Sequence, residues 1–145
     1  MAFPTPQPGL VIRYAFLWRQ NAARGQEEGD KDRPCAVILT ARNTHGDTVV
    51  TVLPITHTPP RNLDLAVEIP APTKARLGLD DDRSWIVVTD ANRFIWPGPD
   101  LRPRKPGDTR SVAYGLLPTR LFDEVRDKLI RAIEARLAAT VPRTP

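Results

Sequence analysis

Two short strings of residues stand at the ends of neighbouring apolar runs and carry side chains suited to phosphate chemistry. Arg33-Pro34 precedes the apolar run 35–40, and Pro54-Ile55-Thr56-His57 closes the run that begins at residue 48. An arginine offers a planar, charged fork that matches a phosphate, and a threonine hydroxyl can donate to a phosphate oxygen. A histidine titrates near neutrality and can therefore move a proton. The two strings are the first place in the chain to look for a site.

Each of these side chains also has an ordinary structural interpretation. Arg33 follows a run of acidic residues that includes Asp30 and Asp32, and it could simply form an ion pair there. The Thr56 hydroxyl could satisfy a turn beside the prolines, and His57 could be an exposed loop residue. Cys35 lies inside an apolar run and is expected to be a small buried hydrophobe. Both interpretations stay open on residue types alone.

Composition excludes several classes of protein. The 145 residues include one cysteine and two histidines, so we expect no internal disulfide and no zinc site, and no cofactor or metal is predicted. No apolar run approaches the roughly 18–20 residues of a membrane span, and the first eight residues do not resemble a signal peptide. A cytoplasmic protein without membrane contact is therefore expected. The net charge of +4 only weakly favours a polyanionic partner.

The elements that must hold these residues are predicted to be mainly β-strands. Proline makes up 16 of 145 residues, which rules out a mostly helical protein because proline breaks helix interiors. Runs rich in β-branched and aromatic residues predict short strands joined by stiff loops. We expect a small, curled antiparallel sheet or partial barrel, with residues 35–40 and 48–55 forming a hairpin. The strands are predicted at 10–18, 35–40, 48–55, 66–69, 84–89, 92–96 and 112–117.

One amphipathic helix is predicted at the end of the chain, from residue 118 or 119 to about residue 139. Its apolar positions recur at helical spacing and include Leu121, Val125, Ile133 and Leu137. A shorter helical turn within 70–79 is expected to stop at Gly78. Residues 19–32 are predicted to be a long polar loop beside Arg33, acting as a mobile lid. The whole chain, 1–145, is expected to be one domain with a flexible arm at 1–8 and a loose tail at 140–145.

The order of these marks resembles the MazF/PemK (Kid) family of toxin endoribonucleases. That family shows a strand after an N-terminal glycine, a charged loop, "RP" before an apolar strand, "PIT" closing the next strand, and a final helix. The same order runs here from about Gly9 to Leu137. The resemblance implies a mainly β fold with a C-terminal helix, an SH3-like small barrel of the MazF/PemK/CcdB type.

The resemblance also implies an activity. It predicts a metal-independent, sequence-specific endoribonuclease that cleaves single-stranded RNA by attack of a ribose 2′-OH on the adjacent phosphate. The "RP" arginine is Arg33 and the "PIT" threonine is Thr56, and both are predicted to be catalytic. His57 stands where many relatives have serine. Our hypothesis is that His57 transfers a proton.

A second set of positions is predicted to bind RNA, on and after the strand expected at 92–96. Trp96 offers a ring on which a base could stack, although packing in the core is the plainer interpretation. Asp90 matches the aspartate of PemK-type members, but their arginine two residues earlier falls on Val88, and their glutamine after it on Ala91. The predicted RNA-binding residues are Asp90, Asn92, Arg93, Trp96 and Arg102.

The resemblance implies two protein partners, a cognate antitoxin and a second copy of this chain in a homodimer. Two alternative functions remain. The chain could be a CcdB-like toxin that binds DNA gyrase and cuts nothing, or an inactive relative that serves as a protein-binding module. The "RP" and "PIT" strings favour the nuclease, whereas Val88, Ala91 and His57 leave an inactive relative open.

Overall fold

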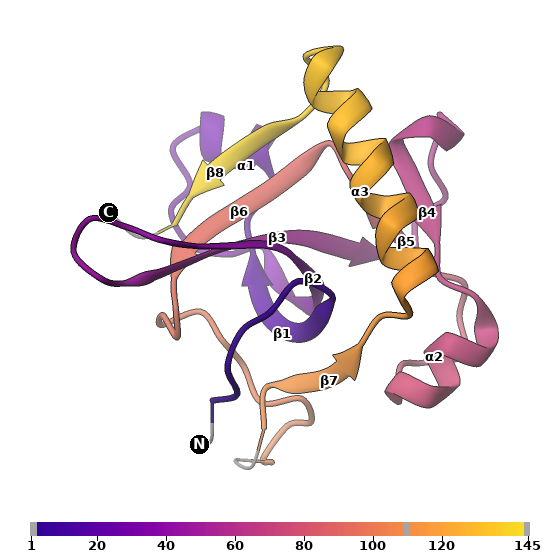
Figure 1. The fold of residues 1–145 in the computed structure, drawn as a ribbon, viewed down its shortest axis with the longest axis horizontal. Helices are drawn as coiled ribbons and strands as arrows, with labels where there is room; N and C mark the ends of the chain where they lie inside the picture. Colours follow the sequence, from indigo (N-terminus) through magenta and orange to yellow (C-terminus); the bar gives the residue numbers. More distant parts are fainter. Residues whose placement is uncertain (1–2, 109–110, 144–145) are drawn as a thin grey trace.

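The computed structural model describes residues 3–108 and 111–143 and shows a curled, mainly antiparallel β-sheet with a helix packed across it (Figure 1). The sheet order is β4-β5-β3-β2-β1-β7, with β6 paired to β3 and β8 paired to β6. This arrangement confirms the predicted fold class. The strands are β1 (Leu10–Phe16), β2 (Lys31–Arg42), β3 (Thr48–Thr56), β4 (Ala66–Glu68), β5 (Trp85–Val87), β6 (Asp90–Ile95), β7 (Ala113–Leu116) and β8 (Ala139–Pro142).

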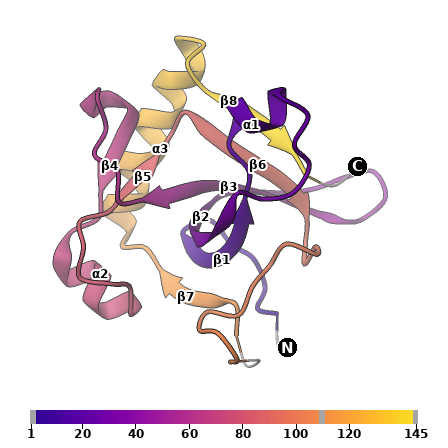
Figure 2. The same cartoon turned by 180° about the vertical axis from the view of Figure 1, so that it is seen from behind.

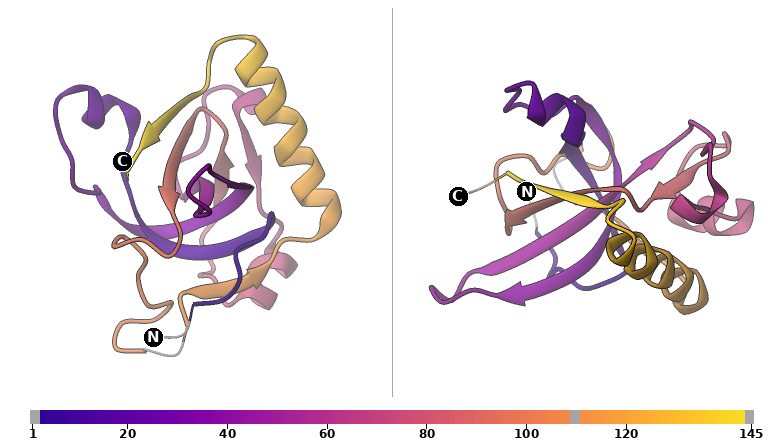
Figure 3. Two further views of the ribbon diagram at one scale, coloured as in Figure 1. Left: turned by 60° about the vertical axis from the view of Figure 1, so that its left-hand side comes forward. Right: turned by 90° about the horizontal axis from the view of Figure 1, so that it is seen from above.

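The predicted hairpin is formed by β2 and β3, and it is longer than the apolar runs suggested. The two strands pair antiparallel from Cys35 opposite Pro54 to Arg42 opposite Thr48. The tip of the hairpin extends past the rest of the molecule on the side away from α2 (Ala71–Leu77) (Figure 1 and Figure 3). The two strings that carry the candidate site residues, 33–34 and 54–57, therefore lie at the inner end of the hairpin, within the body of the protein.

Strand β3 joins the two halves of the curled sheet. Its first part, Val49 to Val52, pairs with β6, and its last two residues, Ile55 and Thr56, pair with β5. The strand thus changes partner along its length and bends the sheet around the core. Thr56 is the last residue of the strand, so its side chain stands where the sheet opens.

Two clusters of buried side chains fill the two faces of the sheet. One contains Val11, Leu53 and Ile86 and extends to the helix α3 (Thr119–Glu134) through Leu121 and Val125. The other is built around aromatic residues inside the curl; it includes Tyr14, Phe16 and Phe94, with Trp18 and Trp96 packed at its edge. The Tyr14 and Phe94 rings stack with centroids 4.5 Å apart.

The final helix is shorter than predicted. α3 ends at Glu134, and Arg136 follows with a left-handed backbone, φ 59°, which interrupts the helical hydrogen bonding. Leu121 and Val125 are buried as expected. Ile133 and Leu137, which the apolar stripe placed against the core, are 57% and 43% exposed.

Residues after the helix return to the sheet. Ala139 to Pro142 form β8, which runs parallel to β6, whereas residues 140–145 were expected to be a loose tail (Figure 2). Arg143 continues into the molecule: its guanidinium donates to the carbonyl of Ala15 at 2.6 Å and forms an ion pair with Asp100 at 3.3 Å. Residues 1–2 of the expected arm and 144–145 of the expected tail lie outside the described residues.

The segment predicted to be a mobile polar loop is largely organised. It contains a short helix, α1 (Arg19–Ala23), and β2 already begins at Lys31. The Asp30 carboxylate accepts hydrogen bonds from the Trp18 backbone and from the side-chain amides of Asn21 and Gln26, at 2.7–3.0 Å. These hydrogen bonds join the two ends of the segment. They involve polar groups, so they leave no apolar periodicity in the sequence.

Two shorter elements cover the open end of β3. A 3-10 turn, η1 (Leu63–Leu65), leads into β4, and α2 follows. Gly78 ends α2 in the left-handed conformation with φ 73°, as predicted for a glycine at a helix C-terminus. The chain then turns through residues 79–84 into β5, and this turn forms one wall of the site.

Candidate functional site

The two site strings meet in a cavity of about 740 Å³ at the inner end of the β2–β3 hairpin. Arg33, Thr56 and His57, predicted to be catalytic, all line it. Its walls come from five places in the chain: β1 and the residue Trp18 after it, the start of β2, the end of β3, the turn after α2, and a last group formed by Arg104, Lys105 and Tyr114. The other lining residues used below are Arg13, Trp18, Lys31, Asp32, Asp80, Ser84, Arg104, Lys105 and Tyr114.

Arg33 is half-buried in this cavity and is held by its neighbours without a charged partner. Its guanidinium donates to the carbonyl of Ile55 at 3.5 Å and lies over the Trp18 ring, 5.1 Å from the centroid. Among residues 3–108 and 111–143, no carboxylate forms an ion pair with it, and its Nε is buried without a partner. The alternative in which Arg33 pairs with the preceding acidic residues is therefore not what this structure shows.

Burial lowers the pKa of Arg33 below its ordinary value, and the nearby Cys35 and Asp30 oppose that change. A guanidinium nevertheless stays protonated at any physiological pH. The site thus presents a fixed positive charge that is partly removed from water, which is the condition in which a cation attracts an anion most strongly.

Thr56 contributes a hydroxyl whose hydrogen is available. Its Oγ1 accepts a hydrogen bond from the Thr58 backbone at 3.2 Å through one lone pair, and the hydroxyl hydrogen donates to no other residue of the described part of the chain. The β2–β3 pairing ends with Cys35 opposite Pro54, and Arg33 and Thr56 each lie two residues beyond that pair. The Thr56 side chain can therefore stabilise the turn, as predicted, and still donate a hydrogen bond to a ligand.

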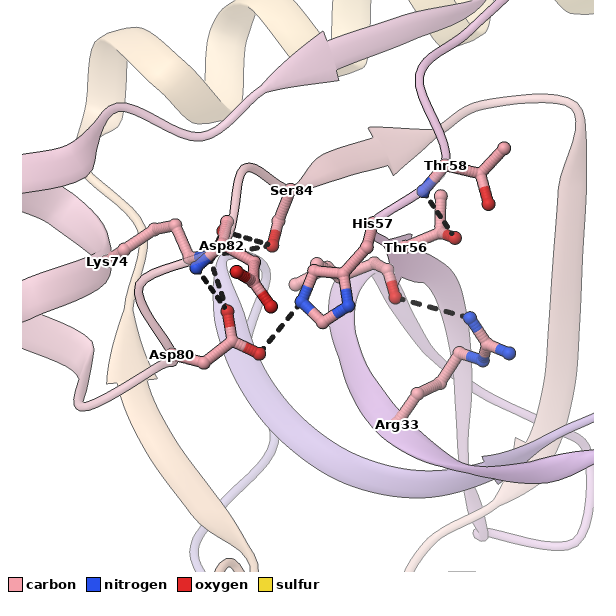
Figure 4. A network of polar contacts seen from close by, with 9 residues as sticks. Arg33, Thr56, His57, Thr58, Lys74, Asp80, Asp82 and Ser84 are labelled. Carbon is pink, nitrogen blue, oxygen red and sulfur yellow. Dashed lines mark hydrogen bonds and ion pairs between the residues drawn. The ribbon is translucent and has the colours of Figure 1, made fainter.

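His57 follows directly and points into a small polar network (Figure 4). Its Nε2 lies 2.8 Å from Oδ2 of Asp80, and about half of each side chain is exposed. Asp80 also accepts from Lys74 at 2.8 Å. Partial burial acts to raise the pKa of Asp80, but Lys74 and His57 outweigh it and hold that pKa below its ordinary value. Asp80 is thus a carboxylate under neutral conditions.

The same corner also brings together three side chains that could hold a metal ion. His57, Asp80 and Asp82 bring ligand atoms within 4.8 Å of one another, and all three are exposed. The ammonium group of Lys74, however, already occupies one Asp80 oxygen and the carbonyl of Asp82. A cation would have to displace this buried charge, so we assign no metal to the cluster.

Positive charge dominates the cavity. Among the described residues that line it, five are basic, namely Arg13, Lys31, Arg33, Arg104 and Lys105, and two are acidic, Asp32 and Asp80. Asp32 is in turn engaged with Arg102, 3.5 Å away. A half-buried arginine surrounded by a basic rim can hold a phosphate group and the backbone on either side of it.

The five positions predicted to bind RNA do not line this cavity. Asp90 and Asn92 are buried and serve the fold: Asp90 accepts from the Arg19 backbone at 3.0 Å, and Asn92 both accepts from and donates to the Leu17 backbone, at 2.9 and 2.7 Å. Asn92 also accepts from the Arg143 guanidinium at 3.0 Å. These contacts connect the end of β1 to β6.

The remaining three positions have different surroundings. Arg93 is exposed on β6. Trp96 packs at the edge of the aromatic cluster, 6.1 Å from the Phe94 ring, in line with the plainer of its two interpretations. Arg102 is the nearest to the cavity, through its ion pair with Asp32. RNA binding by these residues stays a prediction.

Two residues of the site were missed in the sequence. Trp18 was predicted only as part of the strand 10–18, and Asp80 was given no role. Asp80 reaches His57 because β5 pairs with the end of β3, Trp85 opposite Thr56. A signal existed in the run Asp80-Asp81-Asp82 just before an apolar strand, but it did not identify which carboxylate faces the site.

The fold and the site together define a class of protein: a small, curled β-sheet that carries a basic cavity at the end of a hairpin. Residues 13–94 match the family described as PemK-like, MazF-like toxin of type II toxin–antitoxin system. The match covers more than half of the 145 residues, and it includes Arg33, Thr56, His57 and Asp80. The chain belongs to this toxin family, which implies an antitoxin as its partner. None of the curated proteins matches the chain.

In the described part of the chain, no helix is long and apolar enough to cross a bilayer.

Proposed function

We propose that the cavity binds single-stranded RNA and cleaves it without a metal ion. The observation that supports this proposal most strongly concerns Arg33. Its guanidinium is half-buried, lines the cavity and has no carboxylate partner among the described residues. A buried cation without a counterion is unfavourable unless a ligand supplies the negative charge. A phosphate of the RNA backbone would do so.

The proposed reaction is attack of a ribose 2′-OH on the adjacent phosphate. The 2′ oxygen forms a bond to phosphorus, the bond from phosphorus to the 5′ oxygen breaks, and the products carry a 2′,3′-cyclic phosphate and a 5′-OH. Arg33 would stabilise the negative charge that develops on the phosphate oxygens, and Thr56 would donate a hydrogen bond to one of them. His57 would transfer a proton. Because DNA lacks the 2′-OH, it is not a substrate.

The basic rim would hold the strand on both sides of the reacting phosphate. Lys31, Arg104 and Lys105 would contact neighbouring phosphates, which gives affinity without sequence preference. Recognition of a short sequence would come from contacts to unstacked bases. We also propose that the chain acts in the cytoplasm as a homodimer. Exposed apolar residues such as Leu116, Ile130 and Ile133 support self-association.

Cleavage of a long unstructured RNA in EDTA tests the proposal. Wild-type protein is expected to cut at a short recurring motif. Arg33→Ala is expected to lower kcat by about 100-fold or more and Thr56→Ala by about tenfold, in line with the loss of charge stabilisation and of one donor. Matched controls lie on the same strands far from the cavity: Arg42→Ala at the end of β2 and Thr48→Ala at the start of β3 should retain activity.

No cleavage by a folded wild type across varied RNAs would overturn the proposal. Binding to DNA gyrase by that protein would then support a CcdB-like toxin, and the absence of both activities would support an inactive relative. Cleavage that survives Arg33→Ala would keep the nuclease but remove Arg33 from its centre.

A further inference from the structure

A buried lysine organises the wall of the cavity beside His57. The Lys74 side chain is 6% exposed, and its ammonium donates to Asp80 Oδ1 and Ser84 Oγ, each at 2.8 Å, and to the backbone carbonyl of Asp82. Three acceptors satisfy the three ammonium hydrogens. The turn 80–84 therefore surrounds the buried Lys74 ammonium group, and these hydrogen bonds hold the turn in one conformation.

This contact fixes one oxygen of Asp80 and leaves the other for His57. Oδ1 faces Lys74 and also accepts from the Asp82 backbone at 3.2 Å, whereas Oδ2 lies 2.8 Å from His57 Nε2. Exposed ion pairs usually contribute little because both side chains are free to move. Here one partner is held by a buried group, so the contact with His57 has a defined direction.

The contact selects one form of the neutral imidazole. A carboxylate can only accept, so Nε2 must carry the hydrogen and Nδ1 is left as the acceptor. Figure 4 shows Nδ1 on the side of the ring that faces away from Asp80, toward Arg33 and Thr56. The nitrogen able to take a proton is thus directed to the part of the cavity where the phosphate would sit.

We propose that Asp80, held by Lys74, is a positioning residue that sets the tautomer and orientation of His57 for proton transfer. This inference rests on the proposed function and names a group beyond Arg33, Thr56 and His57. In the step, His57 Nδ1 takes the proton of the attacking 2′-OH while Nε2–H donates to Asp80. The departing 5′ oxygen takes its proton from water. Asp80 keeps its charge throughout and stabilises the imidazolium that forms.

Asp80→Asn is the informative variant because it keeps the size of the side chain. Lys74 needs an acceptor, so the amide oxygen stays with the ammonium and the amide NH₂ turns to His57. That donor favours the tautomer with the hydrogen on Nδ1, which cannot accept a proton there. Asp81→Asn is the matched control: it removes the same charge from the same turn, and the described structure shows no hydrogen bond to the Asp81 side chain.

The first measurement is the nitrogen NMR spectrum of the histidine side chains in the wild type and in both variants. It is recorded at a pH at which the imidazole rings are neutral. The protein has two histidines, and His57→Ala assigns them. We expect His57 to carry its hydrogen on Nε2 in the wild type and Asp81→Asn, and to shift toward Nδ1 in Asp80→Asn. An Nδ1–H tautomer in the wild type would overturn the inference, whether or not the protein cleaves RNA.

The second measurement is a double-mutant cycle on RNA cleavage. Asp80→Asn should lower kcat by about tenfold with little change in KM, and His57→Ala by about 100-fold. If Asp80 acts through His57, Asp80→Asn should have no further effect in the His57→Ala background. An equal loss in both backgrounds would show a merely structural role and overturn the inference, while full activity of His57→Ala would overturn it and leave the nuclease in place.

Discussion

The guanidinium of Arg33 lies over the ring of Trp18, 5.1 Å from its centroid, at the edge of a basic cavity. The two residues come from different segments: Trp18 lies between β1 and α1, and Arg33 lies near the start of β2. A cation over an aromatic face gains about 0.5–2 kcal/mol, depending on how far water is excluded. The ring therefore orients Arg33 without neutralising it, which leaves the charge for a phosphate.

We predict that Trp18→Ala lowers RNA cleavage by about tenfold through kcat, because the guanidinium loses the surface that orients it. Trp18→Phe keeps an aromatic face and should retain most of the activity. Steady-state kinetics with one RNA oligomer separate the two variants. Equal, large losses in both would mean that the indole itself contacts the RNA.

Asn92, which the sequence predicts to bind RNA, is buried in the structure, and its contacts give it a role in stabilising the fold. Asn92→Ala removes its hydrogen bonds to the Leu17 backbone and to Arg143 and leaves buried groups unpaired. The free energy of unfolding should fall by about 2–4 kcal/mol. Arg93→Ala, exposed next to it on β6, should leave stability unchanged. Urea unfolding measures both, and an Asn92→Ala protein of normal stability that binds RNA poorly would contradict this prediction.

Gly29 is required because the chain passes too close to β1 for any side chain. A Cβ built there would lie 2.3 Å from the carbonyl oxygen of Ala15. Gly29→Ala should therefore destabilise the protein by about 1–3 kcal/mol, as overpacking against rigid backbone does. Glu28→Ala, at an exposed neighbouring position, should be neutral within about 0.5 kcal/mol. Thermal unfolding of the two variants checks this, and a stable Gly29→Ala protein would show that the segment can move aside.

Asp30 should make stability depend on acid pH. Partial burial acts to raise its pKa, but hydrogen bonds from Trp18, Gln26 and Asn21 outweigh it, so the pKa is lower in the folded protein than in the unfolded chain. The resulting stability is present above the ordinary carboxyl pKa of about 3.9 and is lost as the pH falls through the folded value.

Asp30→Asn should consequently be less stable than the wild type at neutral pH, with a difference that narrows as the pH falls toward about 2. Unfolding free energies across this range measure the effect. Asp81→Asn serves as the control, since no hydrogen bond to that side chain is described. A difference between Asp30→Asn and the wild type that stays constant with pH would contradict the assigned role.

The local parts of this molecule could be predicted because their signals are local. The "RP" and "PIT" strings lie at the ends of two adjacent strands, so the hairpin alone brings Arg33 and Thr56 to one place. The stop of α2 at Gly78 likewise follows from one residue. Apolar runs and a single glycine in the sequence are enough to predict a hairpin and the end of a helix.

The missed parts depend on contacts between distant segments. Asp80 meets His57 only because β5 adds to the end of β3, and β8 exists only because β6 offers an edge to residues with no strong strand pattern of their own. The apolar stripe of α3 continued to Leu137, but the left-handed Arg136 ended the helix before it. Such features need the tertiary structure, because the deciding partner is far away in sequence.

We propose above all that this cavity cleaves RNA through the ribose 2′-OH. An RNA oligomer carrying the cleaved motif, compared with one that has a single 2′-deoxy sugar at the cleaved position, tests it most directly. In EDTA, we predict 5′-OH and 2′,3′-cyclic phosphate ends from the first oligomer and no product from the second. Cleavage of the deoxy oligomer, or products with 5′-phosphate ends, would contradict cleavage through the 2′-OH.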